Sequence, residues 1–186
     1  MPQKPHTRSH DAPQPGALSL AQRIEQAVEL QGEAAVAARA LSLMAGNNEG
    51  ESFLLLVGGE HAQGILDGAP PLYWPELWGA RALLYVWHDS AAPAVLRALS
   101  NPAWRVREMA ARVVAARDLP AASELTAMTA DETPRVRIAA ARALAAVGTL
   151  EDLDAIRALL KDPLLEVRRG AQQARDALRA RIPGDS

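Results

Sequence analysis

A seven-residue phrase recurs three times in this chain at a nearly fixed interval. The phrase opens with Asn or Asp and closes with Val-Arg, and its copies start at Asn101, Asp131 and Asp162, intervals of 30 and 31 residues. An alanine returns in phase, four residues after each valine. An interval of this length is that of one helix-turn-helix unit, and such units are stable only when they stack on one another. The sequence therefore predicts a stacked helical array whose function lies on a surface.

Apolar residues follow each phrase at steps of three and four. In the clearest copy they run through residues 136–147, which is the spacing of one buried helical stripe, and Gly148 then ends the helix. A second stripe at residues 153–160 predicts a shorter helix that ends before the next phrase. We interpret the two helices as one antiparallel pair.

The order of these features resembles one known repeat family. An acid, Val-Arg, an alanine-rich helix ending near glycine and a second leucine-rich helix are similar to HEAT repeats of the phycobilin-lyase-like type, over residues 101–181. The resemblance implies an all-α, right-handed α-α superhelix, a HEAT-like solenoid. It also implies a scaffold or partner-binding module, the role of most such proteins. It identifies no partner, because one fold hosts many functions.

The period divides the chain into segments and predicts nine to eleven helices in all. We expect a disordered lead-in at residues 1–16, which hold four prolines, and the first helices of the solenoid at 17–69. Repeats then occupy 70–181, and a short tail follows at 182–186. The units within 70–181 are expected at 71–100, 101–130, 131–161 and 162–181.

The first and last units depart from the pattern. At residues 71–77 the phrase gives way to Pro-Leu-Tyr-Trp-Pro-Glu-Leu, without the acid and the arginine, so we interpret 71–100 as a degenerate repeat. The last unit carries Arg175 and Asp176 where earlier units carry apolar residues. A terminal repeat needs a polar outer face, so 162–181 is predicted to be a C-terminal cap. Helix boundaries within 46–70 stay open.

The polar residues of the phrase are predicted to form a structural ladder. Asp131 and Asp162 lie where the chain begins a new helix, so each is placed to accept backbone N–H groups or to pair with the arginine six residues on. Asn101 would supply the same cap without the charge. A ligand role for the arginines is the less favoured interpretation. The ladder residues are Asn101, Arg107, Asp131, Arg137, Asp162 and Arg168.

Six of the seven aromatic residues lie between residues 73 and 104. On the helix expected from Pro75 to His88, one stripe is core, and a second stripe joins three rings to Arg81. Two interpretations of the second stripe stay open: rings that fill an irregular junction, or an exposed stacking platform with Arg81 as its cation–π partner. The platform would be a hot spot for a protein partner. Its predicted residues are Trp74, Trp78, Arg81, Tyr85 and Trp104.

Four arginines also recur with the period and predict a basic ridge two units long. They are Arg105, Arg112, Arg135 and Arg142. A ridge of this kind suits nucleic acid, although Glu166 and Gln173 take the place of arginine in the last unit. HEAT-like arrays with tryptophans and a basic face are similar to alkylpurine DNA glycosylases. A DNA- or nucleobase-binding protein is therefore one alternative, and the name of the repeat type adds a tetrapyrrole-related lyase or chaperone-like module as another.

Composition and motifs narrow the function classes. The chain has no cysteine, which excludes thiolate zinc sites, iron–sulfur clusters and cysteine nucleophiles. No phosphate-binding loop or nucleophile motif is present. A formal charge of −2 argues against a globally basic nucleic-acid binder. The lack of a long apolar run favours a cytoplasmic protein that does not enter a membrane. We expect a non-catalytic protein-interaction scaffold without cofactor or metal, which binds an unidentified protein through an inner face formed by the second helices.

Overall fold

The chain forms an all-helical array in the computed structural model, which describes residues 18–182. Eleven α-helices and no strand occur in that range, so the predicted class and number of helices are confirmed. The lead-in predicted at 1–16 and the tail at 182–186 lie outside the described residues, except for Ile182. The helices are α1 (Leu20–Gln31), α2 (Glu33–Met44), α3 (Glu51–Gly58), α4 (Glu60–Leu66), α5 (Trp74–Ala82), α6 (Ala92–Ala98), α7 (Trp104–Arg117), α8 (Ala122–Met128), α9 (Pro134–Val147), α10 (Leu153–Ala158) and α11 (Leu165–Arg181), with short 3₁₀ helices at Asp89–Ala91, Leu150–Asp152 and Leu159–Lys161.

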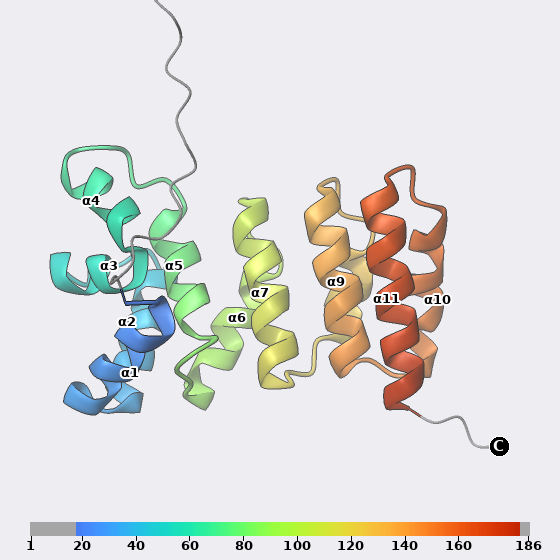
Figure 1. Cartoon of the computed structure of the whole chain (residues 1–186), viewed down its shortest axis with the longest axis horizontal. Coiled ribbons are helices and arrows are strands. Elements are labelled where there is room, and N and C mark those ends of the chain that lie inside the picture. Colours follow the sequence, from blue (N-terminus) through green and yellow to red (C-terminus); the bar gives the residue numbers. More distant parts are fainter. Residues whose placement is uncertain (1–17, 183–186) are drawn as a thin grey trace, which may run out of the picture.

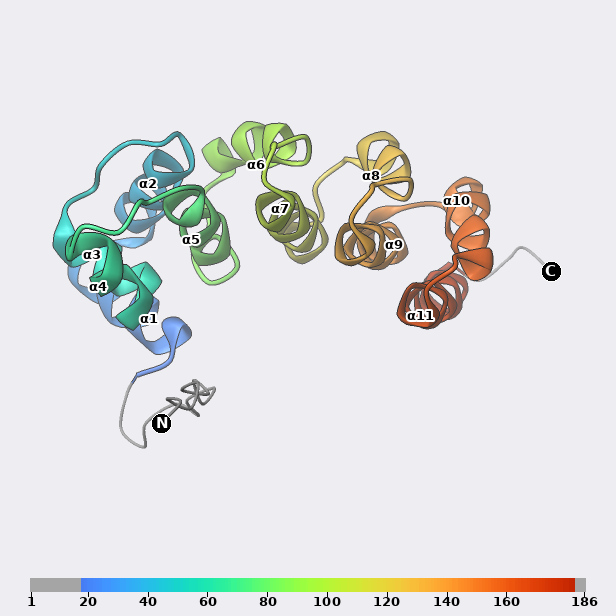
Figure 2. The same cartoon turned by 90° about the horizontal axis from the view of Figure 1, so that it is seen from above.

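From α5 onward the helices form two curved layers (Figures 1 and 2). Helices α5, α7, α9 and α11 lie side by side on the concave side, and α6, α8 and α10 form the convex outer layer. Each inner helix packs on the next inner helix. The helices that line the concave face are therefore the ones that begin with the Val-Arg phrase. The prediction that the second helices form the inner face is wrong.

The helices also pair differently from the prediction. Helix α8 packs on α9, and α10 packs on α11, whereas α9 makes few contacts with α10. The short turn that holds the phrase folds each outer helix directly against the inner helix that follows it. The packing unit is thus an outer helix and the next inner helix, and the pair proposed from residues 136–147 and 153–160 is wrong, although both helices exist.

Alanine recurs in the core of the array. Ala110, Ala140 and Ala171, the three alanines in phase with the repeat, are fully buried. Within residues 18–182 no polar or charged residue is buried as a whole, although the side chain of Asp162 is only 6% exposed in its ion pair with Arg137. The core runs as one continuous cluster from Ile24 in α1 to Leu178 in α11.

Helices α1 to α4 close the N-terminal end of the array. Helix α2 packs along α5, α1 packs on α2, α3 packs on α5, and α1 and α3 pack on each other. Gly59 separates α3 from α4 with a φ of 60°, a left-handed conformation that favours glycine. This break explains why the stretch 46–70 could not be divided into helices from its sequence. No helix within residues 18–182 is both long enough and apolar enough to cross a membrane.

Helix α5 is shorter than predicted. The helix expected to reach His88 ends at Ala82, where the amides of Leu84 and Tyr85 bond to carbonyls three residues back and tighten the chain into a turn. His88 has an extended backbone, and its Nδ1 accepts the amide of Ser90, so it caps the following 3₁₀ helix. The expected position of His88 in a last helical turn is therefore wrong.

Candidate partner-binding surface

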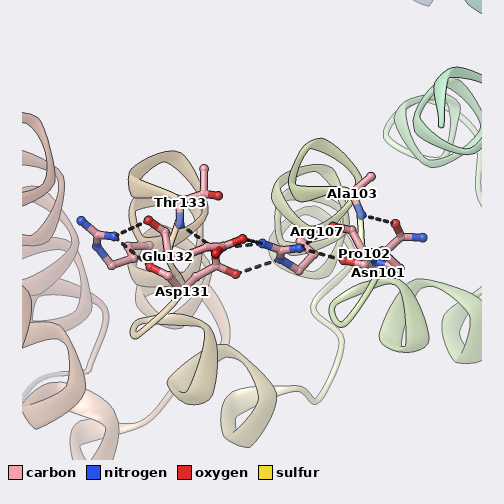
Figure 3. A network of polar contacts seen from close by, with 8 residues as sticks. Asn101, Pro102, Ala103, Arg107, Asp131, Glu132 and Thr133 are labelled. Carbon is pink, nitrogen blue, oxygen red and sulfur yellow. Dashed lines mark hydrogen bonds and ion pairs between the residues drawn. The ribbon is translucent and has the colours of Figure 1, made fainter. Parts of the chain in front are cut away.

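Polar side chains cap the turns that precede α7, α9 and α11, and Figure 3 shows the first two of these turns. At each turn the first residue of the phrase accepts the backbone N–H two residues on, at 2.8 to 2.9 Å. The acceptors are Asn101, Asp131 and Asp162. Such contacts satisfy amides at the start of a helix that otherwise lack a partner. They hold the inner helices in register with one another.

Arginines link each turn to the next. Arg107 donates through Nε and Nη2 to both carboxylate oxygens of Asp131, at 2.8 and 3.0 Å, and Arg137 binds Asp162 in the same way, at 2.8 and 3.2 Å. The expected pairing was with the acid six residues earlier. That residue instead offers its backbone carbonyl, as when Arg137 Nη1 donates to Asp131 at 2.8 Å. Each arginine thus ties two units together, which corrects the predicted pairing within one unit.

The ladder has a different form at each end. Arg168 donates to the carbonyls of Asp162 and Pro163, at 2.7 and 2.9 Å. At the other end, Asn101 Nδ2 donates to a carboxylate oxygen of Glu76 at 2.8 Å. At this first junction the residue of the later unit therefore donates and that of the earlier unit accepts, which is the reverse of the two arginine–aspartate junctions. An aspartate here would face a second carboxylate, which explains why the first copy of the phrase begins with asparagine.

The two ladder aspartates are stabilised as anions. Burial alone would raise the pKa of Asp131, but hydrogen bonds from Arg107 and from a backbone amide hold that pKa below its usual range. Burial acts in the same sense on Asp162, where the amide of Leu164 and the guanidinium of Arg137 outweigh it and lower the pKa. Both carboxylates are charged at neutral pH, so the ladder is intact there.

The aromatic residues do not form the exposed stripe that was one of the predictions. Trp78 is only 3% exposed, and its ring lies so close to α3 that a Cβ on Gly58 would be 2.7 Å from it. Trp78 is a core residue, which corrects its assignment to the hot spot. Trp74 is half-buried, and Tyr85 keeps 49% of its surface exposed beyond the end of α5.

Arg81 is not the cation of the aromatic cluster. Its Nη2 donates to the carbonyl of Val57 at 2.7 Å, near the end of α3. Arg105 occupies that role instead, because its guanidinium lies 4.4 Å from the ring centroid of Trp104 and its Nη1 donates to the Tyr73 hydroxyl at 2.9 Å. The sequence had suggested Arg105 only as part of the basic ridge. The contact joins residues 32 positions apart, and no local pattern indicates it.

A groove runs along the concave face between α7 and α9. Its volume is about 630 Å³. The groove opens away from the outer layer, since the opposite side of α7 carries the buried residues Val106, Ala110 and Val113. Small side chains of the two inner helices make its floor. These residues are Ala111, Ala115, Ala139 and Ala143.

Three of the four arginines of the predicted ridge, Arg112, Arg135 and Arg142, line this groove, and Arg105 does not. Arg112 and Arg142 are exposed, and Arg135 pairs with Glu108 at 3.1 Å. Arg142 reaches a glutamine of α11 only at 3.5 Å. Within residues 18–182 no hydrogen bond or ion pair holds Arg112. Glu166 lines the far end of the groove. The ridge is therefore partly neutralised, and Arg112 and Arg142 are its exposed arginines without a carboxylate partner within residues 18–182.

Comparison with known proteins agrees with this architecture. Residues 92–176 match the family model described as HEAT repeats. The match begins at the first residue of α6 and ends within α11, so it covers the three pairs of outer and inner helices. No curated protein matches the chain. The match supports a HEAT-repeat protein, and the phycobilin-lyase-like type stays a prediction.

Proposed function

We propose that the chain is a non-catalytic scaffold of the HEAT-repeat kind and that it binds a protein partner in the groove between α7 and α9. The observation that carries the proposal is the groove itself, which lies between two inner helices of the concave face and is lined by the partly exposed apolar side chains of Leu84, Ala115 and Ile138. Its volume of about 630 Å³ lies in the range of known binding sites. Solenoids of this kind use their concave surfaces to bind partners.

Tyr85 is the best placed of the predicted hot-spot residues. It is exposed beside the α5 end of the groove, whose lining includes the neighbouring Leu84. Trp74 and Trp104 are half-buried beneath Arg105 and contribute an edge of the same region. We therefore retain these three rings as proposed partner contacts.

Nucleic-acid binding is the second candidate, and the four arginines of the ridge favour it. Two of those charges are engaged within the chain, because Arg135 pairs with Glu108 and Arg105 stacks on Trp104. Glu166 adds a negative charge to the lining. Binding to a phosphate backbone depends on several cations that are free to displace counterions. A polypeptide partner suits the groove better.

A random peptide-display library panned on the folded chain tests the proposal. Ala116 is exposed at the groove on α7, and Ala116→Phe would fill it. Ala158→Phe makes the same change at an exposed site on the outer helix α10. We expect selected peptides to bind the wild type and Ala158→Phe alike and to bind Ala116→Phe at least about tenfold more weakly. Equal binding to the two variants would contradict the proposal.

A further inference from the structure

Positive charge gathers where the groove meets α5. Burial lowers the pKa of Arg81, the Tyr85 hydroxyl acts in the opposite sense, and the charges of Arg23 and Arg112 lower the pKa further. The side chains of α1, α5 and α7 therefore lie close enough to interact. None of the groups that act on Arg81 is a carboxylate.

Some of these guanidinium groups are held by backbone carbonyls of α3. Arg23 Nε donates to the carbonyl of Leu56 and Arg81 Nη2 to that of Val57, both at 2.7 Å. These contacts fix the two side chains against the last turn of α3. Nε of Arg81 is buried without a hydrogen-bond partner among the described residues, and Arg112 is exposed. The cluster has more donors than acceptors, which favours a ligand with acceptor oxygens.

We propose that this end of the groove binds a carboxylate-rich segment of the protein partner. Arg112 is its main contact, Arg81 and Tyr85 lie beside it, and small apolar side chains of the segment lie against the apolar side chains that line the groove. The inference rests on the proposed function, because it names the chemistry of the partner for the same groove.

Charge complementarity supports this occupant, since the charge is unequal along the groove. At the α5 end Arg112 lines the groove together with Leu84, and Arg23 and Arg81 are held on adjacent backbone carbonyls of α3. Toward α11 the charges of Arg135 and Arg142 are offset by those of Glu108 and Glu166, which line the same groove. A partner with its acidic residues at one end would match this distribution.

A polypeptide fits these observations better than a polynucleotide. A phosphate backbone carries one charge per nucleotide, so it favours cations along the full length of its path. Here the excess of positive over negative charge lies mainly at the α5 end of the groove. In the same groove Leu84, Ala115 and Ile138 keep part of their apolar surface exposed, and the side chains of a peptide remove such surface from water more readily than phosphates do.

The test uses a fluorescein-labelled twelve-residue peptide of alternating Glu and Ala. The comparison probes are the alternating Gln and Ala peptide and a labelled oligothymidylate of twelve nucleotides. In fluorescence anisotropy we expect the Glu peptide to bind the wild type and to weaken as salt is added. The other two probes should bind at least about tenfold more weakly.

A matched pair of variants tests whether Arg112 is the arginine that binds the Glu peptide. Arg112→Gln removes an exposed arginine of the concave layer, and Arg97→Gln removes an exposed arginine of the outer helix α6. The Glu peptide should bind Arg112→Gln about tenfold more weakly and Arg97→Gln unchanged, while both variants keep the wild-type melting curve. Equal weakening by the two variants, no binding of the Glu peptide, or equal or tighter binding of either comparison probe would overturn the inference.

Failure of this inference is distinguishable from failure of the proposed function. If library peptides lose affinity for Ala116→Phe but lack acidic residues and bind Arg112→Gln normally, the groove binds a partner of other chemistry and only the inference is wrong. If Ala116→Phe affects no selected peptide, the proposed function is wrong as well.

Discussion

At the scale of single residues, the contribution of each ion pair to stability depends on how deeply the pair is buried. The side chains of Arg137 and Asp162 are only 13% and 6% exposed, whereas the side chain of Arg135 is 68% exposed in its pair with Glu108. Removal of one partner leaves a buried charge uncompensated in the first case and a solvated charge in the second. Two arginines of the same helix turn therefore differ in their effect on stability.

Arg137→Ala should destabilise the chain far more than Arg135→Ala. We expect the free energy of unfolding to fall by about 3–5 kcal/mol for Arg137→Ala, because Asp162 loses both guanidinium hydrogen bonds. For Arg135→Ala we expect about 0–1 kcal/mol, as for exposed pairs in general. Urea unfolding measures both. Similar losses for the two variants would show that the ladder does not hold the units together.

Asn101→Asp should destabilise the chain at neutral pH. The new carboxylate would keep the cap on Ala103, but it would face Glu76 where an amide now donates at 2.8 Å. Two adjacent carboxylates repel, and the pKa of one of them rises. We expect a loss of about 1–3 kcal/mol in the free energy of unfolding at about pH 7 and a smaller loss at about pH 5.

Glu76→Gln in the Asn101→Asp background is the control for that substitution. The exchange restores one amide and one carboxylate at the junction, so it should recover most of the lost stability. If Asn101→Asp were as stable as the wild type at neutral pH, that result would contradict a stabilising hydrogen bond from Asn101 to Glu76.

At the scale of helices, two glycines allow close approach. A Cβ on Gly79 of α5 would lie 2.5 Å from the carbonyl oxygen of Ala40 in α2, and a Cβ on Gly170 of α11 would lie 3.0 Å from the side chain of Ile138 in α9. A backbone oxygen moves only with its helix, whereas an isoleucine side chain can shift slightly. Gly64 in α4 has nothing within 4 Å of that position.

Alanine at these three glycines should therefore have three different effects. Gly79→Ala should lower the free energy of unfolding by about 1–3 kcal/mol, because the two helices must separate. Gly170→Ala should lie within about 1 kcal/mol of the wild type, since a small steric strain opposes the higher helix propensity of alanine. Gly64→Ala should stabilise by up to about 1 kcal/mol. Urea midpoints test this order, and a loss at Gly64 equal to that at Gly79 would contradict it.

Apolar periodicity predicts the helices well but not the layer in which each one lies. The stripes at residues 136–147 and 153–160 correspond to α9 and α10. A stripe shows which face of a helix is buried without identifying the helix that covers it. The same stripe on α10 fits packing against α9 or α11, and the structure has mainly the second. The concave face was consequently assigned to the wrong helices.

The candidate site was predictable only where it follows the repeat. Arg112 and Arg135 recur with the period, so they were found as a ridge. The aromatic stripe was ambiguous, because a ring in the core and a ring on the surface have the same helical spacing. Burial of Trp78 follows from its contact with α3, a segment whose helices the sequence left undecided. The link between Arg81 and Val57 was missed for the same reason.

At the scale of the whole molecule, the ladder should make the array sensitive to acid. The pKa values of Asp131 and Asp162 lie below their ordinary value, which is about 3.9 for an unfolded chain. The stability that they contribute is therefore complete above that value and is lost as the pH falls through the lower folded values.

Urea midpoints measured from about pH 7 to about pH 3 test this dependence. The wild type should lose stability below about pH 4 more steeply than the double variant Asp131→Asn, Asp162→Asn, which should be less stable at neutral pH. Parallel curves for the two proteins would contradict the role of the ladder carboxylates.

The central claim is that the concave layer of α5, α7, α9 and α11 binds the partner and the outer layer does not. Amide hydrogen exchange, with and without a saturating library-selected peptide, tests this claim most directly, because it reports protection helix by helix. The account predicts slower exchange in α7 and α9, with α8 and α10 nearly unchanged. Slower exchange confined to α8 and α10 would contradict it.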